Sequence, residues 1–120
     1  MSLVSQTPID SENLADLDGL VSSYEAFSGL GDTEQFRDLN FGPEELFFIS
    51  SCVKWCATEP AKAACRNTSS DESRYGPWWN RCNFPLKNME AFAEAFSCPV
   101  GSAMRPTAKV PSGTCEPDNE

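Results

Sequence analysis

A chain of 120 residues is the length of one domain and is too short for a second hydrophobic core. Hydrophobic residues make up 40% of it, which is enough apolar surface for folding and argues against disorder throughout. The net charge of −9, with no basic stripe, makes nucleic acid a poor partner. No stretch approaches the roughly 20 apolar residues of a membrane span, and Met1 to Pro8 lacks the apolar run of a signal peptide.

The first predicted helix lies between Ser11 and Phe27, where apolar residues recur at helical spacing. Asp10 or Ser11 can cap its start, because both side chains accept hydrogen bonds from free backbone N–H groups. Gly29 is a natural stop.

A second helix is predicted from Pro43 to about Ala57. Proline suits the first helical position, and Glu44 and Glu45 suit the positive end of the helix dipole. The apolar arc of this helix is so wide that we expect the helix to be largely buried.

The stretch from Glu59 to Leu86 shows neither helical nor alternating periodicity, so it is predicted to be a long loop. Irregular stretches of this length tend to be functional or cross-linked, and Cys65 and Cys82 lie inside it. It also contains an N-glycosylation acceptor at Asn67.

A third helix is predicted from Met89 to Ser97, capped by Asn88 and ended by Pro99, with Phe92 and Phe96 facing the core. The predicted fold is mainly α: a small disulfide-stapled domain of about three helices with a long cross-linked loop and an extended tail. The predicted parts are a flexible N-terminus (1–10), the domain (11–115) and an end segment (116–120). The tail begins at Val100 and is held at Cys115.

Six cysteines in so short a chain, at spacings that match no zinc finger, indicate a disulfide framework formed in an oxidising compartment. We therefore expect a secreted, extracellular protein. Cys52 and Cys56 should not bond each other, because they lie one turn apart on a helix. The sequence leaves the connectivity open among Cys52, Cys56, Cys65, Cys82, Cys98 and Cys115.

The absence of histidine from the 120 residues argues against an enzyme. It excludes an H-E-x-x-H zinc site, a triad of the usual kind and an imidazole acid or base within this stretch. We expect no cofactor and no bound metal.

Four motifs follow one another in a recognisable order. Glu12-Asn13-Leu14-Ala15-Asp16 places two carboxylates on the first turns of a helix, which alone suggests only a solvated helix start. It is followed by the runs from Glu44 to Ile49, from Val53 to Cys56 and from Glu94 to Pro99. Together these motifs resemble the C-terminal end of the neprilysin and endothelin-converting enzyme family of zinc metallopeptidases, over about residues 11 to 115.

The resemblance implies roles for two carboxylates. Glu12 corresponds to the family's third zinc ligand, and Asp16 to the aspartate that steadies a zinc-binding histidine. The two histidine ligands and the general base belong to an H-E-x-x-H helix upstream of this segment. Glu12 and Asp16 are therefore interpreted as a vestigial zinc site.

The family's His-x-Pro-x-x-x-Arg stretch corresponds here to the run from Tyr75 to Arg81. In the family, the histidine stabilises the reacting oxyanion and the arginine holds the substrate backbone. Tyr75 stands at the histidine position, so Tyr75 and Arg81 are interpreted as a vestigial substrate site. The alternative for Arg81 is an ordinary surface arginine or one that pairs with a nearby acid.

The resemblance also implies a pattern of disulfides. Cys56, Cys98 and Cys115 match family cysteines that bond to cysteines earlier in the complete enzymes. The other three have no counterpart in the family pattern, and we expect them to serve as the new partners. The alternative is coincidence, or a rewired enzyme of which this is one part.

Two functional hypotheses follow, and a plain structural or storage role is a third. In the first, a non-catalytic relative of the peptidases binds an extracellular protein or peptide, as an inhibitor, decoy or toxin-like protein. Its binding residues are predicted to be Trp78, Trp79 and Arg81, although the exposed tryptophan pair could instead fill the core. In the second, the chain is part of a zinc metalloendopeptidase domain, inactive without the missing half. Internal disulfides favour the first, and free Cys56, Cys98 or Cys115 favours the second.

Overall fold

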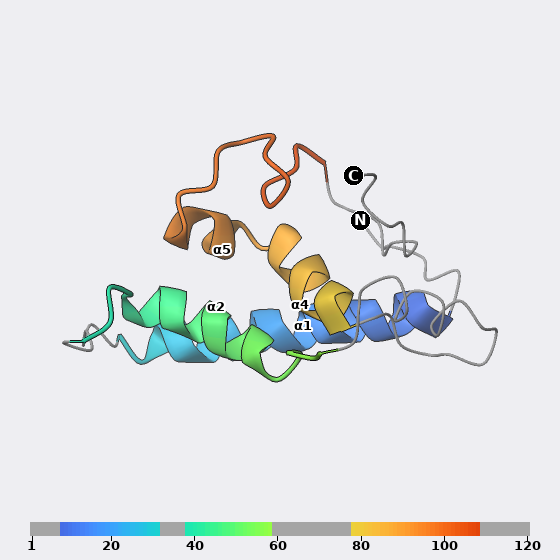
Figure 1. Cartoon of the computed structure of the whole chain (residues 1–120), viewed down its shortest axis with the longest axis horizontal. Helices are drawn as coiled ribbons and strands as arrows, with labels where there is room; N and C mark the ends of the chain where they lie inside the picture. The colour runs from blue at the N-terminus through green and yellow to red at the C-terminus, as the bar shows by residue number, and fades with distance from the viewer. Residues whose placement is uncertain (1–7, 32–37, 59–77, 109–120) are drawn as a thin grey trace.

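A computed structural model of the chain describes residues 8–31, 38–58 and 78–108, and these residues contain four helices and no strand (Figure 1). The helices are α1 (Pro8–Gly29), α2 (Pro43–Val53), α4 (Trp78–Lys87) and α5 (Glu90–Ala95). The predicted mainly α fold class is confirmed. None of these helices has the length and apolar character needed to cross a membrane.

Several predictions made from the sequence fall outside the described residues. They concern the glycosylation acceptor Asn67, Tyr75 at the family's histidine position, the cysteines Cys65 and Cys115, and the end segment 116–120.

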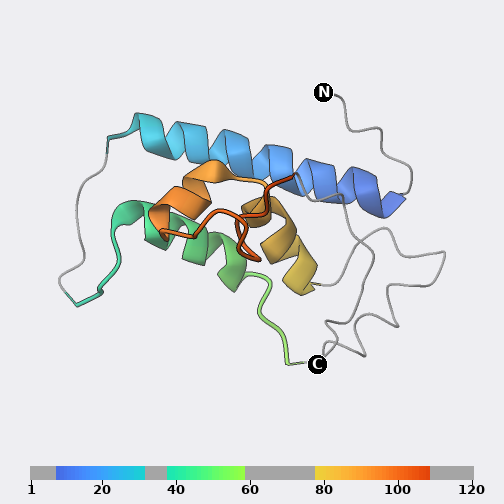
Figure 2. The same ribbon diagram turned by 90° about the horizontal axis from the view of Figure 1, so that it is seen from above.

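The helices form two layers. α1 and α2 lie side by side, and α4 and α5 pack over them (Figures 1 and 2). α4 contacts both α1 and α2, while α5 contacts α2 and α4. The junction of α1, α2 and α4 therefore brings together three segments that are far apart in the sequence.

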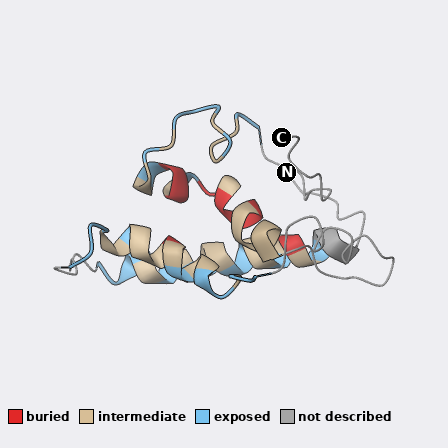
Figure 3. Ribbon diagram, in the orientation of Figure 1, coloured by how far each residue is buried: buried red, intermediate tan, exposed pale blue. Residues whose placement is uncertain are grey.

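The core lies between the layers and is mostly aromatic (Figure 3). Phe48 of α2 is 1% exposed, and its ring centroid lies 5.6 Å from that of Phe92 on α5 and 5.1 Å from that of Tyr24 on α1. Leu86 and Met89 complete the buried cluster. Because aromatic side chains bury the most apolar area per residue, this cluster is the main hydrophobic contribution to stability.

Tyr24 joins α1 to α2 by a polar contact as well. Its hydroxyl donates a hydrogen bond to Glu44 Oε1 at 3.0 Å. Burial, and then the neighbouring Glu44 carboxylate, raise the pKa of Tyr24, because both disfavour the charged phenolate.

The first two helices match their predicted positions with shifted ends. α1 starts at Pro8, three residues before the predicted Ser11, and its last residue is Gly29. α2 begins at Pro43 as predicted, and Glu45 accepts a 2.9 Å hydrogen bond from the backbone N–H of Gly42. α2 ends at Val53 rather than near Ala57, because the chain tightens there into turns.

The prediction of a loop through to Leu86 is wrong for its last part, since residues 78–87 form α4. Pro85 lies inside this helix, where proline normally interrupts the hydrogen-bond ladder. Phe84, Pro85 and Leu86 are all buried, so packing against α1 and α2 stabilises a helix that the local sequence disfavours. Trp78 and Trp79, expected on an exposed loop, are instead half-buried on its first turn.

α5 is shorter than predicted and is capped differently. Its N-cap is Met89, while the Asn88 side chain donates to the backbone oxygen of Phe84 at 2.9 Å, at the end of α4. The helix ends in a Schellman-type turn centred on Ser97, whose φ of 53° is left-handed, and not at Pro99. Phe92 and Phe96 do face the core, as predicted.

The first part of the predicted extended tail is folded. Residues 99–108 form turns, with the N–H of Gly101 donating to the backbone oxygen of Arg105 at 2.8 Å. The Arg105 guanidinium donates to the backbone oxygen of Cys98 at 3.0 Å and forms an ion pair with Glu90. These contacts return the chain to α5.

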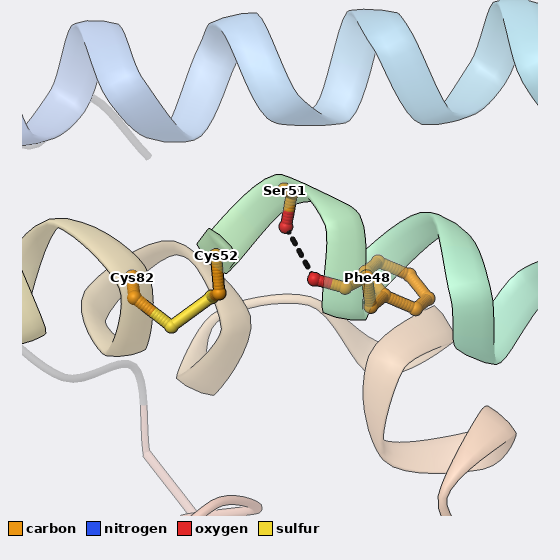
Figure 4. The surroundings of a disulfide bond; sticks show 4 residues. All are labelled: Phe48, Ser51, Cys52 and Cys82. Carbon is orange, nitrogen blue, oxygen red and sulfur yellow. Dashed lines mark hydrogen bonds between the residues drawn. A yellow bond between two sulfur atoms is a disulfide. The ribbon is translucent and has the colours of Figure 1, made fainter. Parts of the chain in front are cut away.

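One disulfide joins two of the described cysteines, Cys52 of α2 and Cys82 of α4 (Figure 4). The remaining described cysteines, Cys56 and Cys98, are free thiols. Cys52 and Cys56 are not bonded to each other, as predicted. The expectation that each extra cysteine would pair with a family cysteine is wrong for Cys52 and Cys82. Contact between α2 and α4 brings these two together, and α4 had not been predicted.

We expect the Cys52→Ala/Cys82→Ala double variant to lose about 3 kcal/mol of unfolding free energy, because the disulfide closes a loop between residues 30 apart. Urea titration followed by circular dichroism measures this loss. Cys56→Ser is the matched control, since Cys56 is exposed and free. Equal stability of the double variant and the control would contradict the prediction.

Candidate functional site

An ion pair between α1 and α4 forms the centre of the candidate site. Arg81 donates from Nε to Asp16 Oδ2 and from Nη2 to Asp16 Oδ1, each at 2.7 Å. Both side chains are 19% exposed. The alternative in which Arg81 pairs with an acid is thus confirmed, and the acid, Asp16, is another of the residues that the family resemblance singled out. A two-pronged arginine–carboxylate pair fixes both groups in orientation as well as position.

Trp55, just beyond the end of α2, supports this pair from a third segment. The Arg81 guanidinium carbon lies 4.1 Å from the centre of the Trp55 ring, and Lys54 Nζ lies 5.1 Å from it. Cations are attracted to the electron-rich face of an indole. α1, α2 and α4 are therefore tied together at Arg81.

A cleft of about 280 Å³ opens beside the ion pair. It lies between α1, α2 and α4, and polar side chains contribute much of its wall. The lining residues are Ala15, Asp16, Gly19, Leu20, Ser23, Ser51, Cys52, Lys54, Trp55, Arg81, Cys82 and Pro85.

A second hollow, of about 370 Å³, adjoins the cleft and is mainly apolar. All three tryptophans of the chain line it, together with the Cys52–Cys82 disulfide. Trp55, Cys52 and Cys82 belong to both cavities. We call the two cavities the polar cleft and the tryptophan hollow.

The described residues do not by themselves form a zinc site. They contain no group of three or more histidine, cysteine, aspartate or glutamate side chains placed to hold a metal ion. Both oxygens of Asp16 accept hydrogen bonds from Arg81, which leaves Glu12 as the available carboxylate of the predicted pair. A catalytic zinc takes about three protein ligands.

The structure brings together Asp16, Arg81, Trp78 and Trp79 of the predicted site residues around the two cavities. Sequence reasoning missed the roles of Lys54 and Trp55, which it used only as part of the family motif from Val53 to Cys56. Their adjacency as a cation and an indole was the available signal.

Asn13, within the Glu12 to Asp16 motif, was also missed. It is 1% exposed, and its Nδ2 has no hydrogen-bond partner among the described residues.

Most of the chain is similar in sequence to known proteins. The model of Peptidase family M13 matches residues 2–111. Neprilysin-2 of Caenorhabditis elegans is 33% identical over 102 residues, and an endothelin-converting enzyme homolog of Locusta migratoria is 33% identical over 105. Membrane metallo-endopeptidase-like 1 of Mus musculus is 32% identical over 99 residues. No solved structure matches the chain.

These similarities cover most of this chain and little of each relative. The aligned part is 82%, 82% and 79% of this chain, respectively. It is 14%, 14% and 13% of the three relatives. The activity of a whole relative therefore does not transfer to these residues by similarity alone.

Asp16→Asn and Glu12→Gln should differ in their effect on stability. We expect Asp16→Asn to cost about 2 kcal/mol, because it weakens charge-assisted hydrogen bonds and leaves Arg81 without its counter-charge. Glu12→Gln should change the unfolding free energy by less than about 0.5 kcal/mol. Urea titration of both variants tests the difference, and equal effects would show that the Arg81–Asp16 pair is not a stabilising contact.

Proposed function

Since the chain belongs to peptidase family M13, we propose that it is a non-catalytic member that binds an extracellular peptide or protein segment. The observation that carries the proposal is the convergence of all three tryptophans on one hollow beside Arg81. Tryptophan and arginine are the side chains most enriched at binding hot spots.

The tryptophan hollow has the properties of a binding site. Its volume of about 370 Å³ is within the range of small-ligand pockets. Trp78 and Trp79 are held by α4, and the disulfide to Cys52 ties that helix to α2. A ligand side chain entering the hollow would meet surfaces that are already ordered, so little conformational entropy would be lost on binding.

The non-catalytic part of the proposal depends on what the site residues can do. Arg81, interpreted as a former substrate-holding residue, has its Nε and Nη2 engaged by Asp16. Glu12 alone cannot hold a catalytic zinc, and the 120 residues contain no histidine to assist it. The family resemblance puts Tyr75 where the peptidases use a histidine for the oxyanion.

The extracellular part of the proposal is supported by cysteine chemistry. A disulfide such as Cys52–Cys82 persists in oxidising compartments and is rare in the cytosol. We propose a secreted glycoprotein, with Asn67 as the glycan acceptor.

A second candidate function is favoured by the free thiols. Cys56 and Cys98 are unpaired among the described cysteines, as expected if the residues are part of a larger peptidase domain that supplies their partners. In that case Glu12 would be one zinc ligand, and the histidines would come from another segment. The relatives, of which this chain covers 14% or less, agree with this alternative.

Metal content distinguishes the two candidates. We expect the protein isolated from its natural source to contain no stoichiometric zinc and to cleave no peptide. A catalytic zinc takes about three protein ligands, and Glu12 would supply one. Atomic absorption and a peptidase assay with and without chelator measure both properties. One tightly bound zinc per molecule, or chelator-sensitive cleavage, would support the second candidate instead.

Binding should depend on the tryptophan hollow. We expect Trp78→Ala/Trp79→Ala to weaken partner binding tenfold or more, which corresponds to a loss of at least about 1.4 kcal/mol of binding free energy. Far-ultraviolet circular dichroism should still report the helices. Isothermal titration calorimetry with the extracellular binding partner measures the loss of affinity. If the double variant unfolds, Trp78→Phe and Trp79→Phe, which keep apolar contact, take its place. Normal binding by the folded alanine variant would exclude the hollow as the site.

A further inference from the structure

Lys54 is the C-cap residue of α2, and it lines the polar cleft. Its ammonium lies 5.1 Å from the centre of the Trp55 ring. The ion pairs of the described residues join Arg81 to Asp16 and Arg105 to Glu90, so Lys54 has no carboxylate partner among them. The Lys54 ammonium therefore lies close to Trp55, which lines both the polar cleft and the tryptophan hollow.

The charges around the cleft leave Lys54 uncompensated. The charged side chains that line it are Asp16, Lys54 and Arg81. Asp16 and Arg81 neutralise each other through two 2.7 Å hydrogen bonds. The acids of α2 are at its other end, where Glu44 accepts from Tyr24 and Glu45 from Gly42. The lining of the cleft therefore carries one uncompensated positive charge, that of Lys54, in a chain whose net charge is −9.

We infer that the bound segment carries an aspartate or glutamate side chain next to a large apolar one. This inference rests on the proposed binding function and specifies its ligand. The apolar side chain of the ligand fills the tryptophan hollow. The neighbouring carboxylate lies in the polar cleft, on the other side of Trp55, and pairs with Lys54. Adjacent ligand residues suit the site because the two cavities share Trp55 and the disulfide.

The carboxylate is assigned to a side chain and not to the end of a peptide. The cleft is lined along α1 as well, by residues that include Gly19 and Ser23. This leaves room for the ligand backbone to pass on. Ser23 and Ser51 each donate to their own helix, to Gly19 and Phe48 respectively, so their oxygens remain as acceptors for ligand N–H groups.

The alternative is that Lys54 only stabilises α2, because a cation at a helix C-terminus interacts favourably with the helix dipole. That role would affect the stability of α2 but would not discriminate between ligands. A test must therefore compare ligands that differ in one charge.

The test uses short acetylated and amidated peptides that contain phenylalanine next to glutamate, in either order, and matched peptides with glutamine. Intrinsic fluorescence follows the titration, because all three tryptophans line the hollow. We expect the better glutamate peptide to bind about threefold more tightly than its glutamine partner, as an exposed ion pair would give. Lys54→Gln should abolish the ratio, and 0.5 M salt should reduce it in the native protein.

Lys87→Gln is the matched control, because Lys87 lines a different cavity near Arg105. It should keep the threefold ratio. If the native protein binds both peptides equally while Trp78→Ala/Trp79→Ala loses both, the inference is overturned and the binding function stands. If Lys54→Gln weakens both peptides by the same factor, Lys54 acts on the fold and the inference is likewise overturned. If none of the peptides binds, both proposals fail.

Discussion

The stacking of the Arg81–Asp16 ion pair on Trp55 is the contact on which the arrangement of the site depends. Asp16 belongs to α1, Arg81 to α4 and Trp55 to the end of α2, so one guanidinium fixes three segments relative to one another. A guanidinium is suited to this because it makes two parallel hydrogen bonds in its plane while its face stacks on an aromatic ring. A lysine could supply the charge but could not form both contacts with the same geometry.

The aromatic core and the disulfide act at different distances from this contact. Phe48 and Phe92 hold α2 to α5, away from the cleft, whereas Cys52–Cys82 crosses between α2 and α4 at its wall. The disulfide therefore stabilises the fold and shapes the cavity at once. Because it is also shared by the tryptophan hollow, a change in the packing of α4 would alter both cavities together.

The sequence predicted what depends on local pattern and missed what depends on tertiary contact. The positions of α1 and α2 followed from periodicity, and the start of α2 at Pro43 from the proline and the acidic residues beside it. The expectation that α2 is largely buried was wrong, since Phe48 is its buried residue and Val53 is 60% exposed. α4 could not be predicted, because Pro85 contradicts a helix locally and only its burial against α1 and α2 compensates. The Cys52–Cys82 pairing depended on α4 and was missed with it. Asp16 and Arg81 were singled out by family resemblance, but their contact across 65 residues required the fold.

The ion pair gives two residues of the family motifs a structural role that does not depend on a metal site. Asp16 on α1 neutralises Arg81, and without it the half-buried guanidinium would lose this counter-charge where α1, α4 and the end of α2 meet. If the proposed non-catalytic function is right, the need to fold is by itself a reason to keep both residues. Glu12 lies one helical turn before Asp16 on α1 and is not part of this ion pair. The two carboxylates of one motif are thus under separate physical constraints: Asp16 is held by packing and charge, and Glu12 is free to serve a metal, a ligand or neither.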